Sequence, residues 1–234
     1  MDFYKLNKDI SIEIKKKKIK NFNLRVLSNG VVTCSVPDNV EEKDVMAFLH
    51  KKSSWIIQKV EKYKKLQNVK SIDILKNGGS VQLLGRHYRI NIKQSQNFHI
   101  EFDDLTINIY CKDKENLEFI QQEYNSYIKQ KMYTFFSDVL DRLYPVVRSY
   151  HIAKPELKIR KMQSCWGNCN RSKQIITMNE FLYKASPLCI EYIVLHELSH
   201  LIYPYHDKNF YNFIELHMPD WKERKKLLNS YYAV

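Results

Sequence analysis

Hydrophobic and polar residues alternate along the first part of the chain in the way that half-buried strands require. The segments Ile10–Ile14 and Phe22–Val26 both have this period of two. Asn29-Gly30 lies between the second segment and the apolar run Val31–Cys34, which predicts a hairpin. An apolar stripe at helical spacing then predicts one helix over residues 41–66.

The pattern predicts a second β segment and then a long helix. Four short apolar runs within residues 81–110 predict a small antiparallel sheet. Apolar residues at three- and four-residue steps predict a helix from Asn116 to Pro145. Two short strands are expected at Leu157–Met162 and Ile175–Met178, on either side of a loop, Cys165–Lys173.

The last part of the chain is predicted to be helical. Ser186 is a suitable N-cap and Pro187 suits a first turn, so a helix should begin there. It should run to about Tyr203, because Pro204 cannot continue it. Two further helical stretches are expected, at Asp207–Leu216 and Pro219–Leu228.

These elements predict an α+β fold with two domains. The composition changes near residues 112–116, with no internal repeat or low-complexity linker. We therefore predict a β-rich N-terminal domain with one helix over residues 1–115. A second domain is predicted over residues 116–234, in which a small sheet and flanking helices surround the helix that begins at Ser186.

Composition is that of an ordinary globular protein, with 44% hydrophobic and 27% charged residues. No apolar run approaches the roughly 18 residues of a membrane span, and residues 1–20 lack the apolar core of a secretory signal. We therefore expect a cytoplasmic protein without a membrane partner. The net charge of +12 would suit nucleic acid, but its lysines are spread along the whole chain.

The cysteines are expected to be reduced thiols. Their number is five, an odd count in a chain without an export signal, which argues against a disulfide framework. Cys165 and Cys169 have a C-x-x-x-C spacing, but no second pair exists to complete a structural zinc site.

The chemistry of the chain is indicated by His196-Glu197-Leu198-Ser199-His200. On a helix, residues four apart lie on one face, so His196 and His200 can bind one metal ion. This is the H-E-x-x-H pattern of zinc hydrolases, in which the glutamate is the general base and not a ligand. The sequence therefore predicts Zn²⁺ as the cofactor and Glu197 as the catalytic base.

Catalytic zinc takes three protein ligands, and His206 is the natural third. The spacing matches that of metzincins, but Tyr203 stands at the position of their glycine, so the chain is not a metzincin. Glu215 competes as the third ligand, because gluzincins take a glutamate from a later helix. His217 is a weaker competitor.

Motifs beyond the histidines indicate a family. They are Trp166-Gly167-Asn168-Cys169, Ile176-Thr177-Met178-Asn179, Pro187, Tyr192–His200, His206 and Phe210. Together they resemble the YgjP-like family of zinc metallopeptidases, also called DUF45. Its pattern is a W-G-S-C loop, a strand that ends in asparagine, an H-E-L-x-H helix and an N-H-S-x-x-F turn. Here Asn168 replaces a serine, and Tyr205 and Asp207 flank His206 in place of asparagine and serine.

The resemblance implies a minimal zincin-like fold for the C-terminal domain. It places the strand Ile175–Met178 beside the active-site helix, as an edge strand that pairs with an extended peptide. We predict substrate-binding roles for Trp166 and Asn179 of the motif. Tyr203 and Tyr205 are the oxyanion donors nearest to the histidines in the sequence.

The leading interpretation is a metallopeptidase that cleaves a peptide or protein substrate with a metal-activated water and the base Glu197. Two alternatives stay open. Some members of the family are described as nucleotide (UTP) pyrophosphatases, although this chain has neither a P-loop nor an evident cluster of acidic residues. From another class of protein, a basic nucleic-acid-associated binding protein would suit the charge.

Overall fold

The structure, a computed structural model, describes residues 3–27, 30–69, 75–162 and 165–231. The chain divides into two units between residues 70 and 71, and each is described by itself. The first unit holds the first sheet and its helices, and the second unit holds everything from residue 75 onward that the structure describes. The predicted domain boundary at residue 115 therefore lies inside the second unit.

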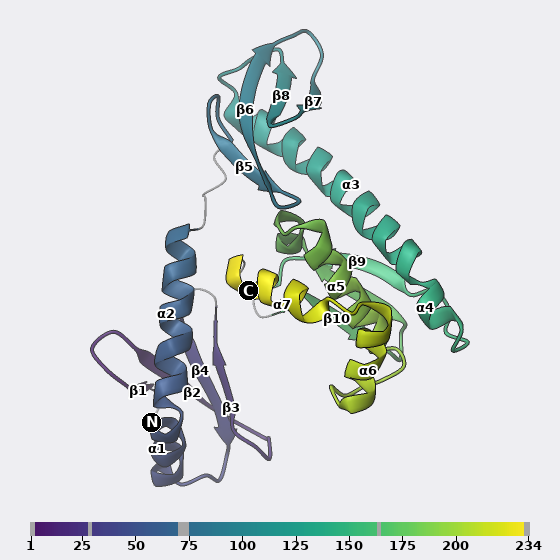
Figure 1. The fold of residues 1–234 in the computed structure, drawn as a ribbon. Helices are drawn as coiled ribbons and strands as arrows, with labels where there is room; N and C mark the ends of the chain where they lie inside the picture. Colours follow the sequence, from purple (N-terminus) through teal and green to yellow (C-terminus); the bar gives the residue numbers. More distant parts are fainter. Residues whose placement is uncertain (1–2, 28–29, 70–74, 163–164, 232–234) are drawn as a thin grey trace. The chain divides into compact units, whose positions relative to one another are not determined.

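The first unit is a four-stranded sheet packed on two helices (Figure 1). Its elements are β1 (Phe3–Lys5), β2 (Ser11–Lys17), β3 (Asn23–Val26), β4 (Val32–Pro37), α1 (Glu42–Lys51) and α2 (Ser53–Val69). The strand order is β1-β2-β4-β3, with β2 parallel to β4. Strands β3 and β4 pair antiparallel, as predicted, although Asn29 of the predicted turn lies outside the described residues. The single helix predicted over residues 41–66 is two helices that meet at Lys52.

The second unit begins with another four-stranded sheet, which repeats the topology of the first. Its strands are β5 (Ser80–Leu83), β6 (Arg86–Gln94), β7 (His99–Asp103) and β8 (Thr106–Cys111). Their order is β5-β6-β8-β7, and the central pair β6 and β8 is parallel. The prediction of an all-antiparallel sheet was wrong, because β7 lies at the edge and leaves β8 to pair with β6.

The second sheet is joined to the C-terminal helices through the turn between β5 and β6. The Leu84 amide donates to the Tyr183 carbonyl at 2.8 Å, and the Gly85 amide donates to the Lys184 carbonyl at 3.0 Å. Buried residues of the sheet, such as Ile90 and Ile107, also share one core with the later helices. These contacts are the physical reason that the unit boundary lies before this sheet and not after it.

The rest of the second unit contains helices and a three-stranded sheet. Its elements are α3 (Leu117–Leu143), α4 (Pro145–Arg148), β9 (Glu156–Arg160), β10 (Gly167–Asn170), β11 (Ile175–Asn179), η1 (Glu180–Lys184), α5 (Pro187–Ser199), α6 (Lys208–His217) and α7 (Trp221–Tyr231). The strand order is β10-β11-β9, with β10 antiparallel and β9 parallel to β11. Strand β10 falls in the predicted loop, so β11 is the central strand and not the expected edge strand.

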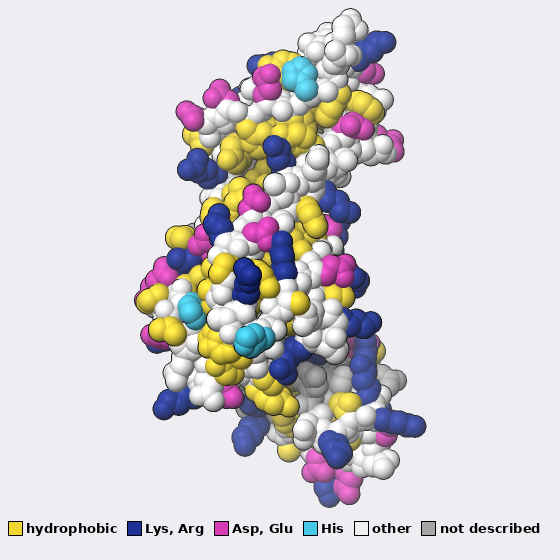
Figure 2. Space-filling view, turned by 90° about the vertical axis from the view of Figure 1, so that its right-hand side faces the viewer, with side chains coloured by type: hydrophobic (Ala, Val, Ile, Leu, Met, Phe, Trp, Pro, Cys, Tyr) yellow, Lys and Arg dark blue, Asp and Glu magenta, His cyan; other side chains and the backbone are white. Residues whose placement is uncertain are grey.

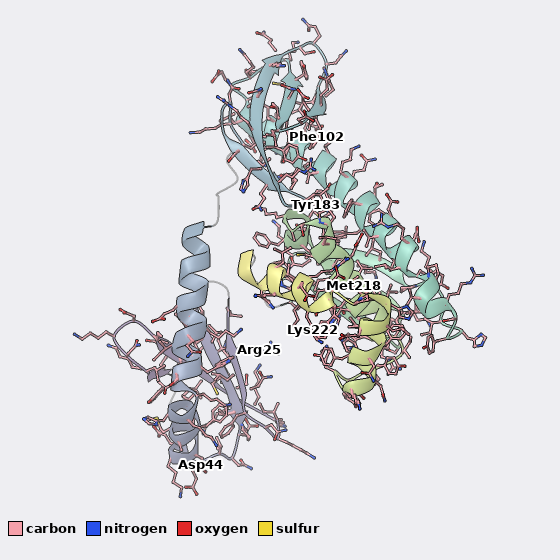
Figure 3. All side chains as sticks on the ribbon, in the orientation of Figure 1. Arg25, Asp44, Phe102, Tyr183, Met218 and Lys222 are labelled. Carbon is pink, nitrogen blue, oxygen red and sulfur yellow. The ribbon has the colours of Figure 1, made fainter. Side chains whose placement is uncertain are left out.

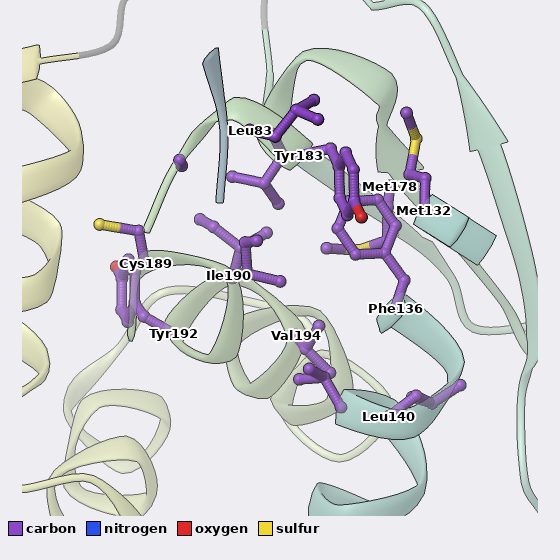
Figure 4. Packing of buried hydrophobic residues seen from close by; sticks show 14 of the residues in the cluster. Leu83, Met132, Phe136, Leu140, Met178, Tyr183, Cys189, Ile190, Tyr192 and Val194 are labelled. Carbon is purple, nitrogen blue, oxygen red and sulfur yellow. The ribbon is translucent and has the colours of Figure 1, made fainter. Parts of the chain in front are cut away.

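Helix α5 lies in the core of the second unit. Most of its residues are buried, which is typical of a helix that is apolar on nearly all sides. Ile190 and Val194 of α5 lie beside Phe136 and Leu140 of α3 (Figure 4). The predicted α+β class is confirmed, with a small sheet and flanking helices around this helix.

The scattered surface charge and the free cysteines both agree with what the composition predicts. On the face drawn in Figure 2, Lys and Arg side chains are scattered and interspersed with Asp and Glu. In the part of the chain that the structure describes, we find no helix with the length and apolarity that crossing a membrane requires. All five cysteines are free thiols. The cytoplasmic location stays a prediction.

Gly85 offers a test of how the second sheet docks onto the C-terminal helices. Its φ is +79°, and a Cβ there would lie 3.0 Å from the Ser186 Cα. Gly78 has a similar φ of +77° but open space around it. We expect Gly78→Ala to lower the free energy of unfolding by about 1 kcal/mol, through backbone strain alone. Gly85→Ala should lower it by about 2 kcal/mol or more, because crowding against Ser186 adds to the same strain. Chemical unfolding of both variants measures the difference, and equal losses would contradict the docking described here.

Candidate metal centre

Helix α5 begins as the sequence predicted and carries the first two histidines. The Ser186 hydroxyl accepts a hydrogen bond from the Cys189 amide at 3.4 Å, and Pro187 occupies the first turn. The helix ends at Ser199, and His200 is its C-cap. His196 and His200 therefore lie one turn apart on the same face, with their ring centres 4.9 Å apart.

The turn after α5 brings His206 back to these two histidines. The Nε2 atoms of His196 and His206 lie 3.0 Å apart, and one ligand nitrogen of each of the three histidines lies within 4.8 Å of the others. When zinc binds nitrogens tetrahedrally at 2.0–2.1 Å, these nitrogens stand about 3.3 Å apart. This is close to the 3.0 Å between the Nε2 atoms of His196 and His206. In the described residues, no other His, Cys, Asp or Glu joins this group.

The backbone of the turn orients the His200 imidazole. Its Nδ1 lies 3.1 Å from the Tyr203 carbonyl oxygen, so Nδ1 donates and Nε2 is left for a metal. Tyr203 has no positive φ, so the turn does not need the glycine that metzincins have there. The structure thus uses the Tyr203 carbonyl to hold a ligand, and not its hydroxyl.

Desolvation favours the neutral form of the three imidazoles. It is the main cause that lowers the pKa of His196 to about 3, and the neighbouring histidines contribute to the same shift. Desolvation also lowers the pKa of His200 and of His206. The His196 Nδ1 is buried without a hydrogen-bond partner, and Nε2, which faces His206, is the atom available to a metal ion. Neutral imidazole is the form that binds metal, so these histidines are ready as ligands at neutral pH.

Phe210 is an aromatic platform that contacts all three imidazoles. Its ring centre lies 5.0 Å from that of His196, 4.7 Å from that of His200 and 4.8 Å from that of His206. The side chain is fully buried. Asp207 positions it, because its carboxylate caps α6 by accepting a hydrogen bond from the Phe210 amide at 3.0 Å. Asp207 therefore supplies the cap that the serine of the family motif would supply.

Glu197 lies beside this cluster but is buried against strand β10. Its side chain is 5% exposed, and burial raises its pKa to about 8. A Cβ on Gly167 would lie 2.6 Å from the Glu197 Cγ and 2.7 Å from Oε1. The chain can therefore bring β10 this close to the glutamate only because residue 167 lacks a side chain.

These groups open into a cavity of about 590 Å³ within the second unit. The metal-ligand candidates, Glu197 and the segment Cys165–Cys169 all line it. Trp166 belongs to this lining, as predicted for substrate contact, and its ring stacks on Phe181 at 6.1 Å. Sequence reasoning missed Tyr211 and Lys225 of the lining, because α6 and α7 approach the site only through tertiary packing. Tyr192 of α5 belongs to the quoted motif, but no role in the site was predicted for it.

The structure gives Asn179 a structural position and not one in the cavity lining. It is 1% exposed, and its amide group donates to the carbonyls of Met162 at 2.8 Å and Cys165 at 2.9 Å. Its Oδ1 accepts from the amides of Met162 and Phe181. Asn179 therefore holds the base of the Trp166 loop.

Neither Tyr203 nor Tyr205 belongs to the described cavity lining. The Tyr203 ring packs against Phe213 at 5.6 Å, and Tyr205 is 76% exposed. The neighbouring Pro204 and His206 do line the cavity. Nearness to the histidines in the sequence did not predict which residues line the cavity, because alternate residues of this turn face opposite ways.

The competing metal ligands lie elsewhere. The Glu215 carboxylate accepts a hydrogen bond from the Trp221 indole at 2.7 Å and pairs with Lys222 at 3.2 Å. His217 packs against Phe213. Burial raises the pKa of the Cys169 thiol to about 12, which disfavours the thiolate that a metal site would need. Among the residues described, His206 is therefore the third member of the cluster.

Comparison with known proteins identifies the family. The family model described as "YgjP-like, metallopeptidase domain" matches residues 20–231, which is most of the chain. The chain belongs to the YgjP-like metallopeptidase family. It is therefore a hydrolase, as its H-E-x-x-H helix predicted.

Two solved structures are similar to part of this YgjP-like chain. The metallopeptidase zymogen abylysin of Pyrococcus abyssi is 20% identical over 42% of this chain and 99% of its own, with a TM-score of 0.37. The zymogen jannalysin of Methanocaldococcus jannaschii is 18% identical over 39% of this chain and 90% of its own, with a TM-score of 0.34. A search of curated proteins found no match.

Membership of the YgjP-like family implies a divalent metal ion and a peptide or protein substrate. The three imidazoles fit such an ion, because desolvation favours their neutral form, their nitrogens lie close together, and the Tyr203 carbonyl orients His200. The family model gives no support to the nucleotide and nucleic-acid alternatives.

The cap at Asp207 can be tested through metal affinity. We expect Asp207→Ala to weaken zinc binding about tenfold, because losing the cap frees both Phe210 and His206. Asp207→Ser should keep the affinity within about threefold, since serine can accept the same hydrogen bond. Competition with a chromophoric chelator measures both values. Equal weakening in the two variants would show that the cap does not matter.

The burial of Glu197 predicts an effect of pH on the stability of the metal-free protein. Its pKa is about 8 in the folded state and near 4.5 when unfolded, so folding takes up a proton between these values. Stability should therefore fall as pH rises from 4.5 through 8. Glu197→Gln lacks this titration, so its stability relative to the wild type should rise by about 4 kcal/mol between pH 5 and pH 9. The histidines are present in both proteins, so their contribution to the pH dependence cancels in the comparison. Urea unfolding in chelator at both pH values measures the difference, and parallel pH profiles would contradict it.

Proposed function

We propose that this chain is a zinc-dependent peptidase in which His196, His200 and His206 bind the ion and Glu197 is the general base. One observation carries the proposal. Three imidazole nitrogens lie within 4.8 Å of one another, next to a buried glutamate that lines the same cavity. When bound, zinc would act as a Lewis acid that polarises a carbonyl and activates a water.

Glu197 is suited to move a proton in both directions. A general base works best when its pKa lies near the working pH, and burial raises that of Glu197 to about 8. The carboxylate would accept a proton from the attacking water and deliver it to the leaving amine. The close approach of Gly167 leaves just enough room for the carboxylate to lie against β10, at the wall of the cavity that the histidines also line.

The edge of β10 supports an extended peptide as the substrate. In the order β10-β11-β9, β10 lies at the edge, and its outer side pairs with no strand in the described residues. Gly167, Asn168 and Cys169 of this strand line the cavity. A peptide could add to this edge as a further strand and so pass beside Glu197. Such a site favours unfolded or extended segments of chain.

Tyr211 is the better candidate for stabilising the developing oxyanion. Tyr192 and Tyr211 are the tyrosines of the cavity lining, in place of the predicted Tyr203 and Tyr205. Tyr192 is buried, and its hydroxyl has a pKa raised by desolvation. Tyr211 is partly exposed and stacks beside His206, with ring centres 6.2 Å apart. Its hydroxyl can therefore reach a substrate carbonyl that approaches the histidines.

Metal content and peptide cleavage test the proposal together. The purified chain should hold about one zinc, and His196→Ala should lose it. Glu197→Gln should keep the zinc but slow cleavage of a peptide library by a factor of about 10² to 10⁴. Gly167→Ala should act in the same way, because the added methyl displaces Glu197 while the ligands stay in place.

The same assays provide the contradicting outcomes. A zinc-loaded wild type that cleaves no peptide, or a chain without tightly bound metal at neutral pH, would refute the proposal. Equal activity of wild type and Glu197→Gln would indicate a contaminant. UTP is included as a substrate, and hydrolysis of UTP alone would point to a nucleotide pyrophosphatase instead.

A further inference from the structure

The cavity beside the metal centre is lined by two basic side chains and one acidic side chain. Its charged side chains, apart from the histidines, are Arg171, Lys225 and Glu197. The Arg171 guanidinium donates to the carbonyls of Leu201 at 3.3 Å and Ile202 at 3.4 Å, so it is engaged with the end of α5. Lys225 is the cation whose role this architecture does not explain.

Lys225 is held in place but has no anionic partner among the described residues. Its neighbour Arg224 anchors α7 through ion pairs with Glu191 at 2.7 Å and Asp220 at 2.8 Å. The Lys225 ammonium lies 5.8 Å from the ring centre of Tyr211 and 5.6 Å from that of Trp221. These rings orient the ammonium by cation–π attraction. Within the described residues, no carboxylate lies within ion-pair distance of it.

The ammonium also faces the metal-ligand side of the cavity. Tyr211, which it contacts, is stacked beside His206. The charge of Lys225 contributes to the lowered pKa of both His196 and His206, as a nearby cation does. A positive side chain next to a site for a divalent cation is electrostatically unfavourable, and a bound anion would offset that repulsion.

We propose that Lys225 is a binding site for a carboxylate of the peptide substrate. The carboxylate is either the C-terminal group of the peptide or the side chain of an Asp or Glu near the scissile bond. This inference rests on the proposed peptidase function and specifies its substrate as an anionic peptide. A charge-assisted hydrogen bond in this partly enclosed position should improve binding about 10- to 100-fold.

The test is a binding measurement in the Glu197→Gln background, in which the metal is retained and peptides stay uncut. Fluorescent peptides of one sequence are compared with free and amidated C-termini, and with Asp or Glu replaced by Asn or Gln. Lys225→Met keeps the aliphatic stem over the rings but removes the charge, and Lys225→Arg retains it. We expect Lys225→Met to weaken binding of the carboxylate-bearing peptides about 10- to 100-fold, and Lys225→Arg to restore most of the loss.

Lys222 supplies the matched control. It lies on the same helix (Figure 3) and contacts the same Trp221 ring at 5.5 Å, but it pairs with Glu215 and is not part of the described cavity lining. Lys222→Met should therefore change every affinity by less than about twofold. If amidation removes the effect of Lys225, the C-terminal carboxylate is the ligand. If replacing Asp or Glu by Asn or Gln removes the effect of Lys225, the ligand is a side-chain carboxylate.

The remaining outcomes overturn the inference and separate it from the proposed function. Equal weakening of neutral and acidic peptides by Lys225→Met would show a packing role only. If the wild type cleaves peptides but Lys225→Met leaves the order of their binding affinities unchanged, the carboxylate site is refuted and the peptidase function stands. Failure of the Glu197→Gln protein to bind any peptide, together with a wild type that cleaves none, would refute both.

Discussion

Helix α5 packs against α3, α6, α7 and β10, and this burial determines the chemistry of the residues that it carries. Removal from water disfavours every charged form, so the same environment holds His196 neutral and raises the pKa of Glu197. A histidine must be neutral to bind a metal ion, and a general base works best when its pKa lies near the working pH. One physical cause, desolvation, therefore prepares both partners while it costs stability in the metal-free state.

The third histidine depends on a different kind of support. His196 and His200 are fixed by helical periodicity, but His206 follows a turn whose backbone must be restrained separately. The Tyr203 carbonyl contacts His200, the Phe210 ring contacts His206, and the Asp207 carboxylate caps the helix that carries Phe210. The histidines and the turn thus stabilise one another, which reduces the freedom that a bound metal ion would otherwise have to restrict.

The centre of the site could be predicted from sequence because its determinants are local. The i, i+4 histidines and the Ser186 cap each act within a few residues, although the helix ends at Ser199 and not near Tyr203 as predicted. Roles assigned by motif membership or sequence proximity fared less well. Asn179 supports a loop through its amide, and Tyr203 acts through its backbone, so neither side chain lies in the described cavity lining. The identity of a residue reveals its chemistry but not which of its groups the fold uses.

What could not be predicted was pairing across the chain. The sequence of strand β10 is Gly-Asn-Cys-Asn, without apolar alternation. The strand forms because its backbone pairs with β11, and glycine is needed at position 167 because a side chain there would clash with Glu197. Both four-stranded sheets share one topology with a parallel central pair, although their sequences show no repeat. Buried isoleucines on both partners, such as Ile90 and Ile107, satisfy that pairing as well as an antiparallel one. Local pattern therefore specifies which face of a strand is buried, whereas the choice of neighbour depends on the packing of the whole unit.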